Sequence, residues 1–376
     1  MIGNNTVTLC MIAKDEEELI GKCIDSVAHL VYRIIVIDTG SIDETARRAA
    51  DKGAEVFNFE WSGDFAAARN FALEQLRSDW VLVLDADETL APVTNEAFQE
   101  LLKATGVEGY FLHIHNYLGM GDAAVRDQVV RLFRNKPEYR FTGAIHEQVA
   151  PSILAANHGG GLATAPLVIH HHGYRHSRIV EKAKSRRNCS IIRHQLEQDP
   201  GNPLLLYYLA VEHYQQGEVI PGLECLERAL GNMLYTDGYF RDIVFNLALG
   251  LAVVGDWEKL ITHVDHCLEM ISVPPSLLLL RGIAYFETGR YREAAQELNQ
   301  ALDLVRASPI RPEALDYISV ASREAWTCTS AIGHGYSGPH LPAVHKLGEL
   351  LWQVCTLILA QTSPQLPLVI ERGAKI

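Results

Sequence analysis

The sequence predicts an α/β domain with a mixed, mainly parallel sheet flanked by helices, followed by an all-α domain. Two observations predict this order. In the first half, short apolar runs alternate with helical segments of about 10–15 residues, which is typical of βαβ units. From about Ser177 onward only helical periodicity remains. We therefore expect two domains, 1–176 and 177–376, in a chain whose 376 residues are enough for both.

The α/β half is expected to contain the following elements in order. The first strands are Thr6–Ile12, Arg33–Asp38, Ala54–Phe59 and a run that begins at Trp80. The helices between them are Glu16–Leu30, a helix from Ser41 to Ala50, and Asp64–Leu76. Ser41 and Glu44 have the spacing of a capping box at a helix start. Three further strands are expected on the far side of the sheet: Gly109–Tyr117, Gln128–Phe133 and Ala165–His170.

The most informative segment joins a buried strand to two carboxylates. The run from Trp80 to Leu84 is apolar throughout, as in a strand buried on both faces, and Asp85-Ala86-Asp87 follows at once. Unpaired ionised carboxylates are costly to bury, so we expect the pair just beyond the strand, where open α/β sheets bind ligands. Carboxylate oxygens there suit Mg²⁺ or Mn²⁺. The competing interpretation is that both aspartates cap a following helix.

The helical half contains three segments in a common register. A glycine stands eight residues after the first member of each pair Leu209-Ala210, Leu247-Ala248 and Arg281-Gly282; these glycines are Gly217, Gly255 and Gly289. Each glycine is expected to end a helix in the left-handed conformation. A second amphipathic helix follows each time: Leu223–Leu230, Trp257–Met270 and Tyr291–Leu304. The pattern resembles tetratricopeptide repeats, whose period is about 34 residues. The alternative is an irregular helical bundle.

Composition excludes some classes of protein. The formal net charge of −13 argues against nonspecific binding to nucleic acid or to an anionic membrane. The apolar stretch Leu350–Ala360 is too short to span a bilayer, so no transmembrane segment is expected. Seven widely spaced cysteines without a CxxC pair, and no recognisable signal peptide, favour reduced thiols and a cytoplasmic location.

Ordered motifs in the α/β half point to a family. They are Met11-Ile12-Ala13-Lys14-Asp15-Glu16-Glu17, Ile37-Asp38-Thr39-Gly40-Ser41, Asp64-Phe65-Ala66-Ala67-Ala68-Arg69-Asn70, Asp85-Ala86-Asp87-Glu88, Val130-Arg131-Leu132-Phe133-Arg134, Ile145-His146-Glu147-Gln148 and His170-His171-His172-Gly173-Tyr174. Each is weak alone, and the ordered set is strong. Roughly residues 6–175 resemble the family 2 glycosyltransferases. With the repeats, the chain is similar to the subgroup that includes the peptide S-glycosyltransferases of bacteriocin pathways, which usually has Asn where Asp15 stands.

The resemblance implies a GT-A fold, a nucleotide-diphosphate sugar as donor, and Mg²⁺ or Mn²⁺. Carried over by motif, Asp38 would contact the base and Asp85 the ribose. Asp87 would hold the metal that bridges the diphosphate and stabilises the leaving nucleotide. The competing interpretation of Asp38 is a helix N-cap.

The same resemblance places Ala13 and Glu16 in the donor site. Arg69 would pair with a phosphate or orient one of the carboxylates of the Asp85-Ala86-Asp87 turn, and Arg131 would bind the diphosphate. The competing interpretation of Arg69 is a charge on the surface of a helix.

An inverting transfer also needs a base that deprotonates the acceptor hydroxyl or thiol. Glu147 is the preferred candidate because a carboxylate is ionised at neutral pH, and His146 is the other. The competing interpretation is a structural pair of His146 with Glu147. In the histidine run after the last strand, alternation puts His170 and His172 on one face, and His172 is expected to complete the metal shell.

The sequence therefore favours a metal-dependent inverting glycosyltransferase whose peptide, protein or glycan acceptor docks on the repeats. Two alternatives remain at this stage. A nucleotidyltransferase also uses carboxylate-held Mg²⁺, but it usually has a glycine- and lysine-rich loop after the first strand, where this chain has Ala13-Lys14-Asp15-Glu16-Glu17. A non-catalytic repeat scaffold with a degenerate transferase domain is the other.

Overall fold

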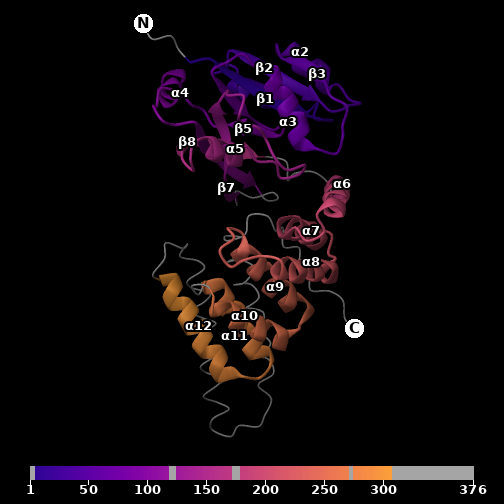
Figure 1. The fold of residues 1–376 in the computed structure, drawn as a ribbon, viewed down its shortest axis with the longest axis vertical. Helices are drawn as coiled ribbons and strands as arrows, with labels where there is room; N and C mark the ends of the chain where they lie inside the picture. Colours follow the sequence, from indigo (N-terminus) through magenta and orange to yellow (C-terminus); the bar gives the residue numbers. More distant parts are fainter. Residues whose placement is uncertain (1–4, 118–123, 172–177, 271–273, 307–376) are drawn as a thin grey trace. The chain divides into compact units, whose positions relative to one another are not determined.

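The computed structural model describes residues 5–117, 124–171, 178–270 and 274–306 (Figure 1). The chain divides into two compact units, Met1–Lys184 and Ser185–Ile376, and the division falls inside helix α6 (Arg178–Gln198). The first unit is an α/β domain and the described part of the second is all helical (Figure 1).

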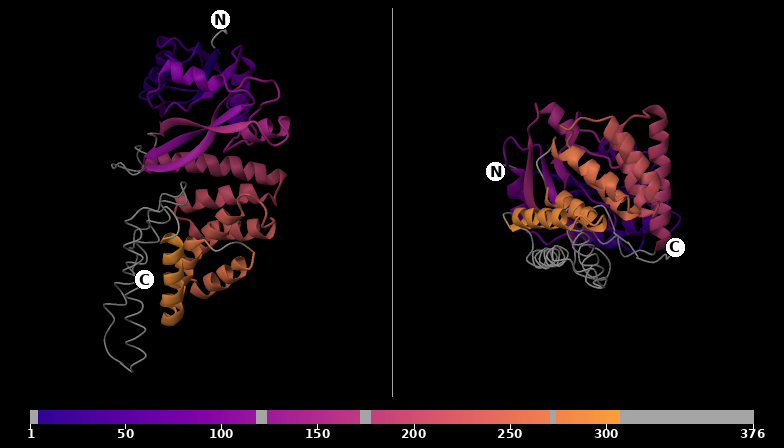
Figure 2. Two further views of the ribbon diagram at one scale, coloured as in Figure 1. Left: turned by 90° about the vertical axis from the view of Figure 1, so that its left-hand side faces the viewer. Right: turned by 90° about the horizontal axis from the view of Figure 1, so that it is seen from below.

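The first unit is built on an eight-stranded mixed sheet with the order β3-β2-β1-β4-β7-β6-β8-β5. The strands are β1 (Val7–Ala13), β2 (Arg33–Asp38), β3 (Glu55–Asn58), β4 (Trp80–Val83), β5 (Glu88–Leu90), β6 (Gly109–Tyr117), β7 (Ala124–Arg134) and β8 (Leu162–His171). The first four are parallel, and β7 pairs with β4 in the antiparallel direction. The long strands β6 and β7 form a twisted ribbon that is plain in Figure 2.

Helices cover both faces of the parallel half, and each face has its own apolar core. Helices α1 (Ile20–Val27), α2 (Thr45–Asp51) and α4 (Asn95–Leu102) pack on one face, where Trp80 and Phe98 are fully buried. Helices α3 (Phe65–Glu74) and α5 (Ala150–Ala156) lie on the other face. Burial on both faces explains the apolar runs of β2 and β4, and it leaves polar groups only at the strand ends.

One expectation for this unit was wrong, and one strand was missed. The capping box at Ser41 does not form, because Ser41 Oγ accepts from the Asp15 amide and α2 begins only at Thr45. The turn after β4 leads into the short strand β5, which was not predicted, so Asp85 and Asp87 cap no helix. The other predicted strands of this unit are present, with ends shifted by a few residues.

The described part of the second unit consists of α6 followed by three helix pairs. The pairs are α7 (Pro203–Gln215) with α8 (Val219–Gly231), α9 (Phe240–Val254) with α10 (Trp257–Leu268), and α11 (Pro275–Glu287) with α12 (Tyr291–Arg306). Figure 2 shows these helices stacked side by side. Gly217, Gly255 and Gly289 have φ angles of 80°, 75° and 77°, so each first helix ends in the predicted left-handed conformation.

Within the described ranges, no helix combines the length and the apolar character needed to cross a bilayer. The predicted helix Leu350–Ala360 lies outside the described residues, as does His172.

Candidate active site

The ends of β1 and β2 meet at the carboxyl edge of the sheet and are joined by polar contacts. Ala13 is the last residue of β1, and its carbonyl oxygen accepts from the amide of Thr39 at 3.1 Å. Asp38 ends β2 and is buried, and its Oδ1 accepts from the amides of Gly40 and Ser41 at 3.1 and 2.8 Å. Asp38 therefore closes a tight turn and does not cap α2.

The loops after these two strands are tied together by side-chain contacts. Asp15 Oδ1 accepts from the amide of Ile42 at 2.8 Å, and the amide of Glu16 donates to Thr45 Oγ1 at 2.7 Å. Asp15 has a φ of 54°, a left-handed conformation in which Asn and Asp are both enriched. The contact uses only the side-chain oxygen that the two residue types share. This explains why Asp can stand where the resembling subgroup has Asn.

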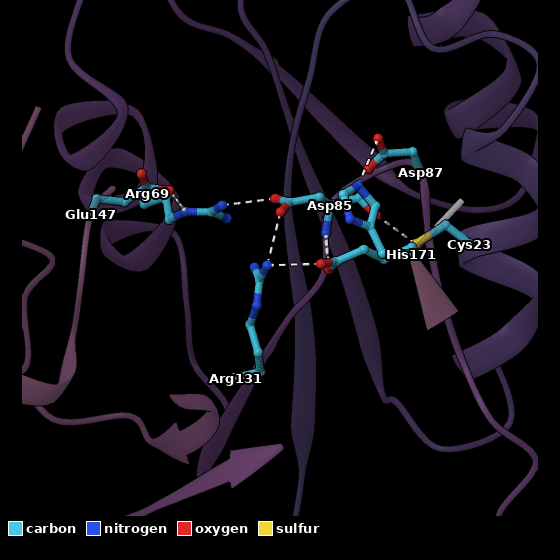
Figure 3. A network of polar contacts seen from close by, with 8 residues as sticks. Cys23, Arg69, Asp85, Asp87, Arg131, Glu147 and His171 are labelled. Atoms are coloured by element: carbon cyan, nitrogen blue, oxygen red, sulfur yellow. Dashed lines mark hydrogen bonds and ion pairs between the residues drawn. The ribbon is translucent and has the colours of Figure 1, made fainter. Parts of the chain in front are cut away.

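Asp85 forms hydrogen bonds with the side chains of four residues, three of which Figure 3 labels. Its Oδ1 accepts from Arg69 Nη2 at 2.7 Å and its Oδ2 from Arg131 Nη2 at 2.9 Å. Its amide donates to Glu88 Oε2 at 2.8 Å, and its carbonyl oxygen accepts from Cys23 Sγ at 3.3 Å. The Asp85 side chain nevertheless remains 36% exposed, so a fixed carboxylate with an open edge stands at the mouth of the sheet.

The two arginines extend this arrangement into a chain of alternating charges. Arg69 Nε donates to Glu147 Oε1 at 2.5 Å, and Arg131 Nη2 also donates to Glu88 Oε1 at 2.9 Å. The order is Glu147–Arg69–Asp85–Arg131–Glu88. Figure 3 labels all of these residues except Glu88. Arg69 is buried, so the interpretation as a surface charge was wrong. Three carboxylates and two guanidiniums leave an excess of negative charge when all are ionised.

Interactions among these five charged side chains, together with burial, shift their pKa values. Burial disfavours ionisation of Asp85, but Arg131 and Arg69 outweigh it and hold the pKa of this carboxyl well below its usual range. Glu88 is almost fully enclosed, and burial raises its pKa to about 7 despite Arg131. Burial lowers the pKa of both guanidiniums, but their carboxylate partners raise it by more, so the arginines stay charged.

Asp87 lies beside this chain and has a different partner. Its Oδ2 lies 3.2 Å from His171 Nε2 (Figure 3). Burial raises the pKa of Asp87, but the bond to His171 lowers it by more, and the net shift is downward. Burial lowers the pKa of His171, whereas Asp87 raises it, and the net shift is upward. Each group therefore favours the charged form of the other.

Glu16 completes the acidic surroundings. Burial, followed by the charge of Asp87, raises its pKa to about 7. A carboxyl that resists ionisation beside Asp87 indicates a region where added positive charge would be stabilised.

His146 and Glu147 lie in a tight loop opposite the start of α3. The loop is closed by paired backbone bonds between Thr142 and Gln148, both 3.0 Å, and His146 has a φ of 53°. Burial lowers the pKa of His146, so its imidazole is neutral at neutral pH. Glu147 binds Arg69 through its carboxylate, a contact that the sequence did not predict.

The donor set fits a divalent cation that takes most of its ligands from elsewhere. Within the described residues, no three His, Cys, Asp or Glu side chains converge as a ready-made metal cage. Asp87 and His171 offer one oxygen and one nitrogen, and Mg²⁺ typically uses one or two carboxylates with water and substrate phosphates.

Sequence reasoning missed three residues that hold the site: Cys23, Glu88 and His171. Glu88 is the last residue of the Asp85-Ala86-Asp87-Glu88 motif, and it pairs with His171 across β5 and β8. Alternation along the strand predicted that His170 and His172 share a face, and His172 lies outside the described residues. The structure places His171 on the face of the buried Leu167 and Ile169, next to Asp87.

Comparison with known proteins agrees with this architecture. Residues 8–158 match the family described as glycosyl transferase family 2. A TPR repeat-containing protein of Synechococcus elongatus is 31% identical over 268 residues, which cover 70% of this chain and 66% of that protein. The first unit has the GT-A fold and the second fits tetratricopeptide-like repeats, as the resemblance implied.

Two further relatives carry glycosyltransferase names. SPbeta prophage-derived glycosyltransferase SunS of Bacillus subtilis is 25% identical over 230 residues, covering 60% of this chain and 54% of SunS. The lipopolysaccharide core biosynthesis glycosyltransferase LpsC of Rhizobium meliloti is 33% identical over 182 residues, covering 45% of this chain and 67% of LpsC. The chain thus spans about two thirds of the first relative and about half of SunS. The family match, these relatives and the carboxylate turn at the carboxyl edge of the sheet agree, and the chain belongs to glycosyl transferase family 2.

Proposed function

We propose that this protein is a metal-dependent, inverting glycosyltransferase that moves a sugar from a nucleotide-diphosphate sugar to an acceptor. The observation that carries the proposal is the Asp85-Ala86-Asp87 turn. It stands at the carboxyl edge of the sheet, beside the ends of β1 and β2, and one of its carboxylates is locked by two guanidiniums. This edge is where α/β sheets bind nucleotides.

The donor would lie along the strand ends. Asp38 has a second carboxylate oxygen for a base N–H, and the open edge of Asp85 suits ribose hydroxyls. Ala13 and Glu16 would border the same site, and Arg131 would act chiefly by holding Asp85. Asp87 and His171 would hold Mg²⁺ or Mn²⁺, and that ion would neutralise charge on the departing diphosphate. His172, which the sequence suggested for this role, lies outside the described residues.

Glu147 is the proposed base. It would take the proton from the acceptor while the acceptor atom bonds to the anomeric carbon and the bond from that carbon to the diphosphate oxygen breaks. In Figure 3, Glu147 and Asp87 lie on opposite sides of Asp85, which supports attack from the side away from the diphosphate. His146, neutral at neutral pH, is the second candidate.

The acceptor is proposed to be a peptide or protein side chain, or a glycan, that docks on the helical unit. Stacked helix pairs offer a long surface for such ligands. A shortened chain that lacks the pairs α7–α12, if it still folds, should retain donor binding and lose transfer. Normal transfer by that folded, shortened chain would assign the helices another role.

The direct test is a screen of UDP-glucose, UDP-galactose, UDP-N-acetylglucosamine and GDP-mannose for slow hydrolysis, read as release of the nucleoside diphosphate. We expect release with at least one donor in Mn²⁺ or Mg²⁺ and its loss with a chelator. Release that is indifferent to the chelator would contradict the metal role. Pyrophosphate release from nucleoside triphosphates, with none of the sugar donors used, would favour a nucleotidyltransferase.

A further inference from the structure

Helix α3 holds the loop of the proposed base through three residues. Asn70 makes two bonds to the backbone of Phe141, each 2.9 Å, and the amide of Phe65 donates to the carbonyl oxygen of Ala144 at 2.9 Å. Arg69 adds the bond to the Glu147 side chain and lies over the Phe141 ring, 5.6 Å from its centroid. The backbone of the loop and the carboxylate in it are thus positioned separately.

Arg69 joins two carboxylates that have different roles in the proposed reaction. Its Nη2 binds Asp85 on the donor side and its Nε binds Glu147 on the acceptor side. A guanidinium is planar and rigid, so these two donors fix the spacing of the two carboxylates. In sequence, Arg69 is 16 residues from Asp85 and 78 residues from Glu147, so no local structure sets this spacing.

The two carboxylates depend on Arg69 unequally. Asp85 has Arg131 as a second cationic partner, with a bond of 2.9 Å. Glu147 has Arg69 as its one ion-pair partner within the described part of the chain. Loss of Arg69 would leave Asp85 anchored, whereas the Glu147 carboxylate would be largely buried and free to change rotamer.

We infer that Arg69 is a positioning residue that ties Glu147 to the donor-binding turn, so that the base acts at a distance fixed by Asp85. The inference rests on the proposed function, because it requires Glu147 to act as a base. It assigns Arg69 mainly to turnover, whereas the family resemblance implied either a bond to a donor phosphate or the orientation of a carboxylate in the Asp85-Ala86-Asp87 turn.

The test is a double-mutant cycle with Arg69→Met, Glu147→Gln and the pair together. Methionine retains much of the apolar stem of arginine and removes the guanidinium. Turnover is measured as nucleoside diphosphate release from the best donor of the screen, and affinity as calorimetric binding of the matching nucleoside diphosphate with Mn²⁺. We expect Arg69→Met to slow release by about 100-fold, because a misplacement of about 1 Å has that effect. Nucleotide affinity should stay within about threefold, since Arg131 still holds Asp85.

The double variant decides how Arg69 acts. If Arg69 acts through Glu147, the double variant releases nucleotide within about twofold of Glu147→Gln alone. Multiplied losses, or a fall in nucleotide affinity that matches the fall in turnover, would overturn the inference. Normal release by Glu147→Gln would instead refute the choice of base and the inference with it, while leaving metal-dependent transfer standing.

Two controls separate positioning from folding. Asn70→Ala removes the hydrogen bonds from Asn70 to the backbone of the same loop and keeps the charge of Arg69. It should lower the melting temperature, and its effect on turnover should be independent of the effect of Glu147→Gln. Arg69→Lys keeps the positive charge and loses the planar guanidinium with its two donors, Nε and Nη2. It should bind nucleotide normally and recover only part of the turnover, and it replaces methionine in the cycle if Arg69→Met does not fold. Full recovery with lysine would show that charge alone suffices and would overturn the fixed-spacing argument.

Discussion

Each unit contains an arginine between two carboxylates, and the two settings differ. In the α/β unit, Arg69 binds Asp85 and Glu147, which come from a turn and a loop at the edge of the sheet. In the helical unit, Arg281 of α11 binds Asp265 of α10 and Glu297 of α12, so its partners lie within regular helices. The first arrangement continues through Arg131 to Glu88 and stands beside Asp87, whereas the second joins three neighbouring helices.

The difference teaches how to separate a site from a structural ion pair. Neither burial nor pairing distinguishes the two arginines, since their side chains are 9% and 12% exposed. What differs is the surplus of carboxylates beyond Asp85: Glu88 shares Arg131 with Asp85, and Glu16 lies within reach of the charges of Asp87 and Asp85. Such a surplus is costly unless a cation arrives. Variants in the α/β unit should therefore affect turnover, stability or both, and variants in the helical unit should affect stability only.

Replacement of Asp87 by alanine should have the largest effect. We expect turnover to fall by more than about 100-fold, because loss of a direct metal ligand should exceed the cost of losing a residue that merely supports one. The melting temperature should stay close to that of the wild type. Asp79→Asn is the matched control, because Asp79 binds Thr6 at the opposite end of the same strand. Equal turnover in the two variants would remove the metal role from Asp87.

Replacement of Arg131 by methionine should mainly destabilise the α/β unit. Removing one member of a buried ion pair costs about 3–5 kcal/mol, and Arg131 supports both Asp85 and Glu88. Unfolding in urea measures this loss, and Glu88→Gln in the same chain should recover part of it. A loss below about 1 kcal/mol would mean that the charges compensate one another in some other way.

Arg281→Met should cost less, about 1–3 kcal/mol, because Asp265 is half exposed and only Glu297 is left without its partner in the interior. Donor hydrolysis should not change. This variant sharpens the comparison, since lower hydrolysis at an unchanged melting temperature would show that the helical cluster has a part in the reaction.

The smallest effect concerns pH. Burial raises the pKa of Glu297 above its ordinary value of about 4.5. The folded state therefore retains this proton to a higher pH than the unfolded state, and the associated stability is lost as pH rises from about 4.5 through the folded pKa. Glu297→Gln removes this contribution. The melting temperature of the variant relative to the wild type should rise over that window, and a difference that does not vary with pH would contradict the shift.

The predicted strands and helix pairs were largely confirmed because burial on two faces and helical periodicity are local signals. The apolar runs of β2 and β4 could be recognised without knowing which elements pack against them. The same holds for the glycines after α7, α9 and α11. The site was predicted less fully. The contacts of Arg69 with Glu147 and of Asp87 with His171 join residues 78 and 84 positions apart. Only the order of strands brings such residues together.

To predict that His171, and not a neighbouring histidine, contacts Asp87, the short strand β5 would have to be known. The alternation along β8 was correctly expected, but which histidine turns toward Asp87 depends on pairing with β5. That three-residue strand is too short to show a period in sequence. The roles given to individual site residues stay predictions until the variants are measured.

The pairing of β5 with β8 also has a consequence for the growing chain. Contacts between distant residues form only after the intervening segment has closed into a loop. On the ribosome, the turn with Asp85 and Asp87 emerges long before His171 and Glu147 exist. Until β8 is made, Asp87 stands without His171, its hydrogen-bond partner. A nascent chain that ends before residue 171 therefore has Arg69 and Arg131 to bind Asp85 but lacks the partner of Asp87, so the site is assembled only when the last strand of the sheet is added.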